Sequence, residues 1–355
     1  MVTGNFGDGK GHGGGIASES GLLTIEDSTV SDNESVAGGG GIEIYGITSP
    51  TAVILNSTIS GNRALNAEDG LGGGIHCSDC QLDIVNSTIT GNEAAVEGGG
   101  ISNSGTVTLR NVTVTGNTAD ADGVPNPFDG IDDGGGVHNG SGAALFLKNS
   151  ILAGNSDESG EAPDCTGTAT SQDFNVIGDS TGCTIAGTTT NNVTGEDPLL
   201  AALSGNGGPT RTHALLADSP AIDAGDPAGC VDENGDPLTR DQRGFDRPVG
   251  SACDIGAFEV GGCGDGTVDA AKGEECDDAN ADDTDDCRND CTLPPPARRV
   301  ERRPAVEQGA ETTPAAGVRS FDNGGTDETD ESIHFPGRDS GLLPFFELGA
   351  GPRHS

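Results

Sequence analysis

The sequence predicts an all-β fold, a parallel β-helix in which each short coil of chain stacks on the one before it. Two repeated strings lead to this prediction. The string [IV]-x-G-N, with single substitutions in two copies, recurs along the first half of the chain, and GGG[IV] recurs between its copies. A repeat length between about 20 and 50 residues is typical of solenoids and other repeat arrays. The repeat asparagines are Asn33, Asn62, Asn92, Asn117 and Asn155, and the glycine runs end at Ile16, Ile42, Ile75, Ile101 and Val137.

Apolar residues fill three fixed positions in every repeat, three, eight and ten residues before the repeat asparagine. The positions eight and ten back lie two apart, so they share one face of a strand. One coil cannot bury such a face alone, and a stack of parallel strands buries a continuous core. These residues are Val30, Ile59, Ile89, Val114 and Leu152 at three back, Ile25, Ile54, Ile84, Leu109 and Leu147 at eight back, and Leu23, Ala52, Leu82, Val107 and Leu145 at ten back.

A column of mostly asparagine lies six residues before each repeat asparagine. Asparagines stacked in register can hydrogen-bond along the pile, so we expect a ladder at this column. Three members also begin N-x-[ST] sequons, which the ladder explains better than glycosylation does. The column consists of Asp27, Asn56, Asn86, Asn111 and Asn149.

Other repeat folds fit the sequence less well. The 60 glycines among 355 residues argue against the long helices of an α-solenoid. A propeller blade needs four strands in about 40–45 residues, more than these repeats hold. Collagen requires glycine at every third position, and the chain lacks that pattern.

The composition of the chain favours some classes of binding partner and disfavours others. The 57 acidic and 17 basic residues give a net charge of −40, which disfavours nucleic acids and anionic membranes and favours cations. No run of about 18 apolar residues is present, so we expect no membrane span. Aromatic residues make up only 3% of the chain, which counts mildly against a groove that stacks sugars on aromatic rings.

Ten cysteines, an even number, predict disulfides and therefore an exported protein. The C-x-x-C at Cys77 and Cys80 is half a zinc site at most, and a local disulfide is the simpler interpretation. Cys165 lies close to Cys183 in the sequence, as Cys230 does to Cys253. The last four cysteines leave three pairings open; they are Cys263, Cys276, Cys287 and Cys291.

The chain opens in mid-repeat, and Met1 is followed by no apolar signal-peptide core. We therefore expect that the start is missing. From the cysteines, we expect the protein to be extracellular, at the cell surface or in the outer membrane. An uncovered first coil would expose strand edges, which predicts self-association through it.

Composition changes divide the chain into four parts. Residues 1–160 carry the repeats, and residues 161–260 have fewer glycine triplets and more proline. Residues 261–293 form a cysteine- and acid-rich module. Residues 294–355, rich in Pro, Arg, Glu and Thr, are predicted to be a disordered tail.

The GGG[IV] and [IV]-x-G-N strings resemble the repeats of polymorphic outer-membrane proteins and related right-handed β-helix proteins, which carry Phe where this chain has Val, Ile or Leu. The strings NVIG, DPLL, NGGPTRTHALL, SPAIDAG, DQRGFDRP and CDIGAFE resemble the choice-of-anchor domain that follows such β-helices in bacterial surface proteins. CGDGTVDAAKGEECDDAN resembles the cysteine-rich repeat named after myxobacteria. The resemblance implies an exported bacterial surface protein with a right-handed β-helix, a C-terminal cap and a disulfide-rich module. It does not imply a defined activity.

Clustered carboxylates and a histidine mark one weak candidate for catalysis. On a β-helix such a group is similar to the acids of pectin hydrolases, where carboxylates protonate the leaving group and activate water. Here they share one glycine-rich loop, so a polar turn is the competing and preferred interpretation. The residues are Asp129, Asp132, Asp133 and His138.

A second candidate is a calcium site in the acid-rich module. Calcium takes six to eight oxygen ligands in loose geometry, and crowded carboxylates within a disulfide-closed loop repel one another without a cation. A solvated acidic loop explains the composition equally well. The candidate ligands are Asp265, Asp269, Glu275, Asp277, Asp278, Asp283 and Asp285.

Mixed charges near the end of the second part have a structural role in our interpretation. We expect them to form a buried ion-pair network in a cap that stops end-to-end growth of the solenoid. They are Asp241, Arg243, Asp246, Arg247, Asp254 and Glu259.

These observations favour a surface-displayed stalk or adhesive protein, stabilised by calcium, over an enzyme. Its partner is expected to be a surface glycan or a protein. The alternative is a polysaccharide lyase or glycoside hydrolase of the pectin-degrading type. That alternative requires carboxylates from adjacent coils, basic residues beside them and aromatic residues at the rim, and the chain offers little of the last two.

Overall fold

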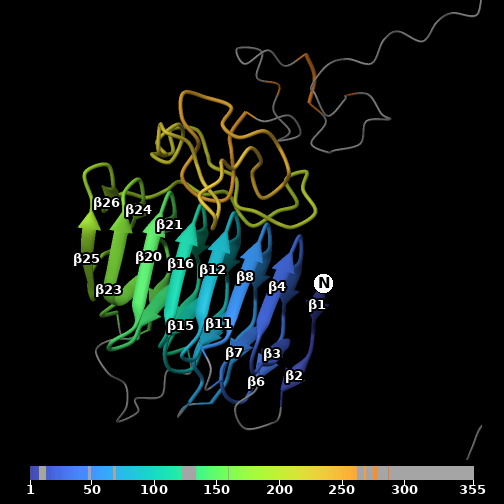
Figure 1. Cartoon of the computed structure of the whole chain (residues 1–355), viewed down its shortest axis with the longest axis vertical. Helices are drawn as coiled ribbons and strands as arrows, with labels where there is room; N and C mark the ends of the chain where they lie inside the picture. The colour runs from blue at the N-terminus through green and yellow to red at the C-terminus, as the bar shows by residue number, and fades with distance from the viewer. Residues whose placement is uncertain are drawn as a thin grey trace, which may run out of the picture. The chain divides into compact units, whose positions relative to one another are not determined.

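The computed structural model describes residues 1–7, 13–46, 49–66, 69–121, 133–158, 160–261, 268, 275–277 and 287. The chain divides into two units, Met1–Ala297 and Arg298–Ser355, and every described residue belongs to the first. All regular elements of this described part are short β-strands stacked in parallel (Figure 1). The all-β parallel β-helix predicted by the repeats is confirmed.

The strands before the five repeat asparagines, together with one earlier strand and two later ones, form one eight-stranded stack, called here the first sheet. The residue three positions before each repeat asparagine points inward from this sheet. Its two neighbours point outward, because side chains alternate along a strand. Its strands are β1 (Val2–Thr3), β5 (Thr29–Ser31), β9 (Thr58–Ser60), β13 (Thr88–Thr90), β17 (Thr113–Thr115), β21 (Ile151–Leu152), β24 (Val176–Ile177) and β26 (Val193–Thr194).

The strand after each repeat asparagine forms a second sheet of two-residue strands. Glycine or Asp32 precedes the asparagine with positive φ, for example 64° at Gly61, and this left-handed turn directs the chain into the second sheet. The strands are β2 (Phe6–Gly7), β6 (Glu34–Ser35), β10 (Arg63–Ala64), β14 (Glu93–Ala94), β18 (Thr118–Ala119) and β22 (Ser156–Asp157).

The remaining strands form a third sheet with two sides, joined by the long strand β23 (Cys165–Gln172). One side starts where each glycine run ends: β3 (Ile16–Ser18), β7 (Ile42–Ile44), β11 (Ile75–Cys77), β15 (Ile101–Asn103) and β19 (Val137–Asn139). The other side carries the apolar positions eight and ten back: β4 (Leu22–Glu26), β8 (Thr51–Leu55), β12 (Gln81–Val85), β16 (Thr106–Arg110) and β20 (Ala144–Lys148).

The three apolar columns meet inside the stack. Leu82 pairs with Ala52 and Val107, and Ile84 pairs with Ile54, so like positions lie above one another. Every member except the partly buried Leu23 is buried. Full burial of an aliphatic side chain contributes about 1.5–3 kcal/mol, so the columns are the main source of stability.

The asparagine ladder runs through the repeat asparagines themselves, and the prediction that placed it six residues earlier is wrong. Asn62 Nδ2 donates to Asn92 Oδ1 at 2.9 Å, and Asn92 Nδ2 donates to Asn117 Oδ1 at 2.9 Å. The second Nδ2 proton reaches a backbone carbonyl of the preceding coil, as from Asn92 to Ile59. The same links join Asn5 to Asn33, Asn33 to Asn62 and Asn117 to Asn155.

The column six back serves as a turn. Its five members all have positive φ between 46° and 55°, a conformation that asparagine and aspartate tolerate better than other non-glycine residues. Within the described residues, the one side-chain link along this column is Asn86 Nδ2 to Asn56 Oδ1, at 3.1 Å.

The glycine runs and the repeat asparagines occur together because their residues pack against each other in the fold. A Cβ on Gly74, the third glycine of its run, would lie 3.0 Å from Asn92 Nδ2, and one on Gly100 would lie 3.1 Å from Asn117 Nδ2. A Cβ on the middle glycine, such as Gly99, would lie 2.4 Å from backbone carbon of Thr118. Glycine is therefore required where the backbone of one coil meets its neighbours.

The stack continues past residue 160, although both strings end there. Asp164 stands level with Gly136, because the next residues Val137 and Cys165 are paired. Its Oδ1 accepts from Asn155 Nδ2 at 2.9 Å and its Oδ2 accepts from the Asp179 amide at 2.6 Å. A carboxylate ends the ladder because it accepts on both sides. Beyond it, β23 pairs with β25 (Cys183–Thr188), and a disulfide joins Cys165 to Cys183.

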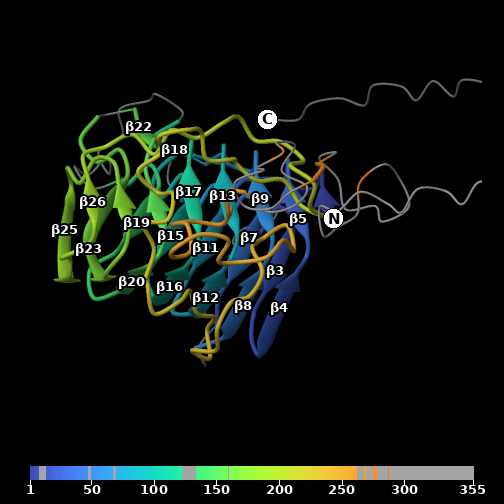
Figure 2. The same cartoon turned by 90° about the horizontal axis from the view of Figure 1, so that it is seen from above.

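Residues 196–261 form a loop-rich segment alongside the coils. Figures 1 and 2 show this yellow-to-orange segment beside the middle of the stack and not beyond its last strand. Its apolar residues cover the outer side of the first sheet where the outward positions become apolar, at Ile151, Ala153 and Val176. The segment contributes Leu215, Ala221, Ile255 and Phe258 to this second core. It therefore braces the side of several coils, in contrast to the end cap that we expected.

Candidate functional site

The structure separates the acidic-loop candidates. Asp129 and Asp132 lie outside the described residues, whereas Asp133 and His138 lie within them. Asp133 is only 3% exposed, and its carbonyl accepts from the Gly98 amide. A carboxylate that protonates a glycosidic oxygen must reach the polymer, so a buried Asp133 is poorly placed for the hydrolase chemistry.

His138 belongs to a column of polar residues that points outward from the third sheet. His138 Nε2 lies 3.3 Å from Glu97 Oε2, and its Nδ1 lies 3.1 Å from Thr166 Oγ1. Two coils away, His76 Nδ1 donates to Glu43 Oε1 at 3.0 Å. Both imidazoles are mostly buried, and a carboxylate fixes the orientation of each. These contacts favour structural cross-links between coils.

The proposed calcium ligands fall mainly outside the described residues. Glu275 and Asp277 are described and flank Cys276, which forms a disulfide with Cys287. The other candidates, Asp265, Asp269, Asp278, Asp283 and Asp285, are not among the described positions. In the described part of the chain, no group of three or more His, Cys, Asp or Glu side chains could hold a metal ion.

The C-x-x-C is a disulfide in the fold, as predicted. Cys77 and Cys80 are both buried and join the end of β11 to the turn before β12. A third disulfide links Cys230 to Cys253 within the C-terminal segment.

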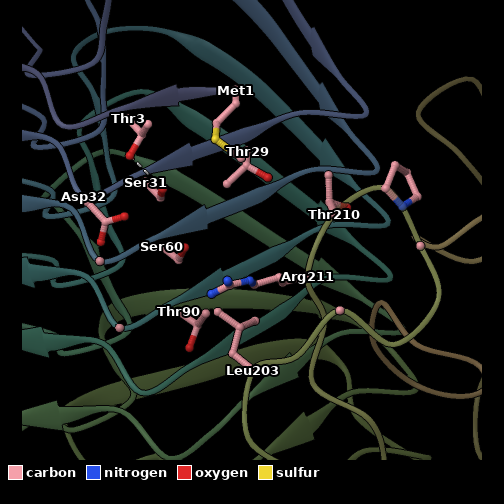
Figure 3. Close-up of a pocket in the computed structure, with 15 residues that line it drawn as sticks. Met1, Thr3, Thr29, Ser31, Asp32, Ser60, Thr90, Leu203, Thr210 and Arg211 are labelled. Atoms are coloured by element: carbon pink, nitrogen blue, oxygen red, sulfur yellow. Dashed lines mark hydrogen bonds between the residues drawn. The ribbon is translucent and has the colours of Figure 1, made fainter. Parts of the chain in front are cut away.

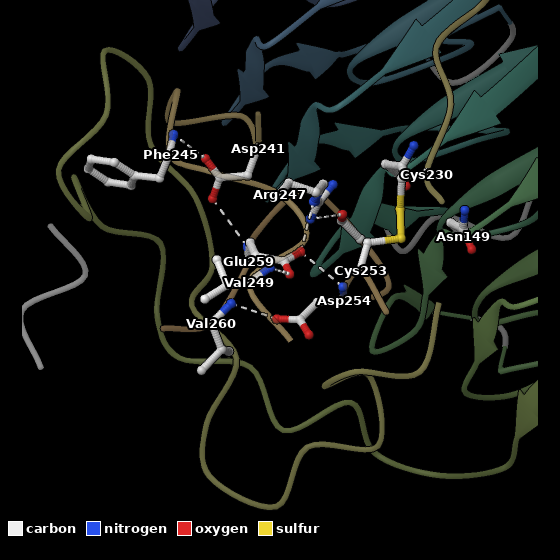
Figure 4. A network of polar contacts seen from close by, with 12 residues as sticks. Asn149, Cys230, Asp241, Phe245, Arg247, Val249, Cys253, Asp254, Glu259 and Val260 are labelled. Atoms are coloured by element: carbon white, nitrogen blue, oxygen red, sulfur yellow. Dashed lines mark hydrogen bonds and ion pairs between the residues drawn. A yellow bond between two sulfur atoms is a disulfide. The ribbon is translucent and has the colours of Figure 1, made fainter. Parts of the chain in front are cut away.

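A buried ionic network holds the C-terminal segment together (Figure 4). Arg243 pairs with Asp241 at 2.7 Å, and Arg247 pairs with Glu259 at 2.9 Å, with almost no exposure of any of the four side chains. The guanidinium of Arg243 also lies 3.6 Å from the centre of the Phe258 ring. The predicted ion pairs are therefore present. Asp246 is the exception, because it forms an exposed pair with Arg240.

Asp254 lies in this network without a cation of its own. Burial, and then the nearby charge of Glu259, raise the pKa of Asp254 to about 7, although backbone hydrogen bonds from Asp223 and Val260 favour the ionised form. Its oxygens accept from the amides of Asp223 at 2.6 Å and Val260 at 2.5 Å. The segment therefore contains a group that titrates near neutral pH.

The segment docks through threonines of the first sheet. Thr58 Oγ1 donates to the Arg211 carbonyl at 2.6 Å, and Thr88 Oγ1 donates to Gln242 Oε1 at 2.6 Å. On the next coil, Thr113 Oγ1 accepts from the Ala257 amide at 3.1 Å. These threonines lie four residues before successive repeat asparagines, so the repeat itself supplies one docking hydroxyl per coil.

The outward hydroxyl residues two positions before the asparagines form the floor of a groove (Figure 3), where Thr3, Ser31 and Ser60 are at least partly exposed and Thr90 is buried. The groove has a volume of about 630 Å³ between the first sheet and residues 203–211. Its floor is a row of four residues, Thr3, Ser31, Ser60 and Thr90, which are paired in register from strand to strand. Arg211 extends over this row between Ser60 and Thr90, and Asp32 lies at the opposite edge.

His213 supports the end of the row. Its Nδ1 lies 2.7 Å from the Ala201 carbonyl, which can only accept, so Nδ1 carries the proton. Burial lowers the pKa of His213, which favours the neutral ring, and Nε2 then accepts from Thr90 Oγ1 at 3.0 Å. His213 therefore fixes the buried hydroxyl of Thr90 at the end of the row.

Our sequence reasoning did not identify the groove residues. The sequence did contain a signal for the groove floor. In the strings TVS, TIS and TIT, a hydroxyl residue lies on each side of the apolar residue that is three positions before the repeat asparagine. Arg211 carried no such signal, because its position depends on how the segment folds back across the coils.

Comparison with known proteins agrees with the geometry. Residues 1–151 match the family model for a right handed beta helix region. The match and the parallel sheets together support a right-handed β-helix repeat in this chain. Searches of curated proteins and of solved structures returned no significant match. The described residues contain no helix that is long and apolar enough to cross a membrane.

Proposed function

We propose that this β-helix protein is a stalk displayed on a bacterial cell surface, and that one lateral face of the stack is an interaction surface. This proposal rests on the way in which residues 196–261, called here the brace, pack along the side of the stack. Residues 196–261 bond to threonines of three successive coils and bury a second apolar core on the first sheet. A solenoid tied along its side resists bending, and the same segment leaves the groove open beside it.

Composition and chemistry support an exported location. Four disulfides lie among the described residues, and disulfides persist in oxidising compartments. The resemblance of residues 173–259 to a choice-of-anchor domain points to the same place. The charge of −40 keeps such a protein away from nucleic acids and anionic membranes.

Calcium belongs to this proposal as a stabilising ion of the acid-rich module. The support is compositional: Asp and Glu dominate between Cys263 and Cys287, and external calcium would offset their repulsion.

Labelling of intact cells tests the surface role. An antibody raised against the folded protein is applied to intact and to permeabilised cells of the producing bacterium. We expect equal labelling of both, and loss of the signal after brief protease treatment of intact cells. Labelling that requires permeabilisation would contradict the proposal.

A further inference from the structure

The groove floor presents hydroxyls at a regular spacing. Thr3, Ser31, Ser60 and Thr90 are successive cross-strand neighbours about 4.8 Å apart, and the hydroxyls of the first three are at least partly exposed. A hydroxyl both donates and accepts hydrogen bonds. The row therefore suits a ligand that repeats polar groups along an extended chain parallel to the stack.

Among the side chains that line the groove, Arg211 is the one cation and Asp32 is the one anion. Arg211 and Asp32 are exposed, and neither charged group has a side-chain partner among the described residues. The backbone of Arg211 is fixed, because its carbonyl accepts from Thr58 Oγ1 at 2.6 Å and from Gln242 Nε2 at 3.1 Å. The backbone of Arg211 is thus fixed beside the floor, and its side chain extends over the floor (Figure 3).

Charge selects a neutral ligand. The formal charges of Arg211 and Asp32 cancel within the groove, whereas the whole chain carries −40 and repels polyanions at a distance. A guanidinium offers fixed donors and a carboxylate offers acceptors, which together can bind hydroxyl groups of an uncharged sugar.

We propose that this groove binds a neutral, extended oligosaccharide that lies across successive coils. The inference rests on the proposed role as a surface interaction protein and names the ligand class for one face. The volume of about 630 Å³ is within the usual range of small-ligand sites. Leu203 and Pro209 supply apolar surface for sugar C–H groups, but no aromatic ring lines the groove, so the affinity is modest.

Calorimetric titration of the full chain tests the ligand class. The probes are cellohexaose, mannohexaose and laminarihexaose, with hexagalacturonate as the anionic counterpart. We expect one neutral hexasaccharide to bind with one-to-one stoichiometry and to bind at least tenfold more tightly than hexagalacturonate. Arg211→Ala should weaken that binding about tenfold, because a charged hydrogen-bond donor is lost. Ser60→Ala should weaken it a few-fold.

Arg240→Ala is the matched control, because Arg240 is an exposed arginine of the same segment that pairs with Asp246 away from the groove. It should leave the affinity unchanged, and thermal unfolding should show that all three variants fold. Three results would overturn the proposal: no binding of any neutral hexasaccharide, a preference for hexagalacturonate, or equal affinity of Arg211→Ala and the unmodified protein. If surface labelling succeeds while these titrations fail, the ligand class is rejected and the stalk role stands.

Discussion

Arg247 ties the C-terminal segment to the coil of Asn86, which lies 161 residues earlier: Arg247 Nη1 donates to Asn86 Oδ1 at 3.0 Å. The same guanidinium pairs with Glu259 and donates to the Gly256 carbonyl at 2.9 Å. Asn86 in turn donates to the Arg240 carbonyl at 3.0 Å. A turn residue of the repeat thus serves as the contact point for the brace.

Arg247→Met should release this brace. The change leaves Glu259 buried without its cation, and breaking a buried pair in this way costs about 3–5 kcal/mol. Hydrogen exchange followed by mass spectrometry should show faster exchange in residues 196–261, with residues 75–115 still protected. Arg240→Met is the control, because its ion pair is exposed and worth about 0–1 kcal/mol. Equal exchange in the two variants would contradict the role given to Arg247.

Asn92→Ala tests the ladder. Asn92 is fully buried; its Nδ2 donates twice, and its Oδ1 accepts from the backbone and side chain of Asn62. Loss of these bonds, with buried partners left unsatisfied, should lower the free energy of unfolding by about 3 kcal/mol or more. Chemical denaturation measures the loss, and the exposed Asn234→Ala should change it by less than about 0.5 kcal/mol. A loss at Asn92 no larger than at Asn234 would show that the ladder does not stabilise the stack.

Gly99→Ala tests the contact between coils. The added Cβ would meet backbone of Thr118 and Gly135 at 2.4–2.5 Å, and backbone cannot move aside as a flexible side chain can. We expect a cost of about 2 kcal/mol or more in a thermal or chemical unfolding experiment. Gly205→Ala offers a matched control, because a Cβ added there would meet no atom within 4 Å and the φ of Gly205 is not in the left-handed region. Similar stability of the two variants would refute the packing argument.

The repeat columns made most of the fold predictable. An inward residue such as Ile59 recurs at a fixed distance from its asparagine, and the strand period of two then assigns its neighbours Thr58 and Ser60 to the outer face. The ladder was assigned to the wrong column because both columns contain asparagine. Only the backbone conformation distinguishes the two columns. The residues six positions before the repeat asparagines have positive φ, and their side chains point away from the core.

The candidate groove could not be predicted in the same way. Its floor follows from the repeat, but its wall depends on contacts such as Thr58 with Arg211, which lie 153 residues apart and belong to no period. The apolar outward residues Ile151 and Val176 mark where the segment docks, and they become informative only when their partners Leu215 and Phe258 are known.

Calcium should stabilise the acid-rich module if the proposed ligands bind it. At a calcium concentration about 100-fold above the dissociation constant, the bound state gains about 2.7 kcal/mol. Proteolysis between Cys263 and Cys291 should therefore slow in calcium compared with chelator, and an equal concentration of magnesium should protect less. Simultaneous Asp283→Asn and Asp285→Asn changes should reduce the calcium effect. Identical cleavage rates in calcium and chelator would remove calcium from the proposal.

The raised pKa of Asp254 predicts that the C-terminal segment loses stability as the pH rises from about 4 to 7. Burial lifts the pKa of the folded state to about 7, above the ordinary value of 3.8. Below about pH 4 the carboxyl is protonated in both states, and the contribution is fully present. Between the two values only the unfolded state gives up its proton, so the contribution falls by about 1.4 kcal/mol per pH unit. Unfolding of the unmodified protein and of Asp254→Asn, measured from pH 4 to 8, isolates this effect as a difference in slope. The exposed Asp246→Asn should instead follow the unmodified protein, and an Asp254→Asn profile parallel to both would show that Asp254 stays ionised in the fold.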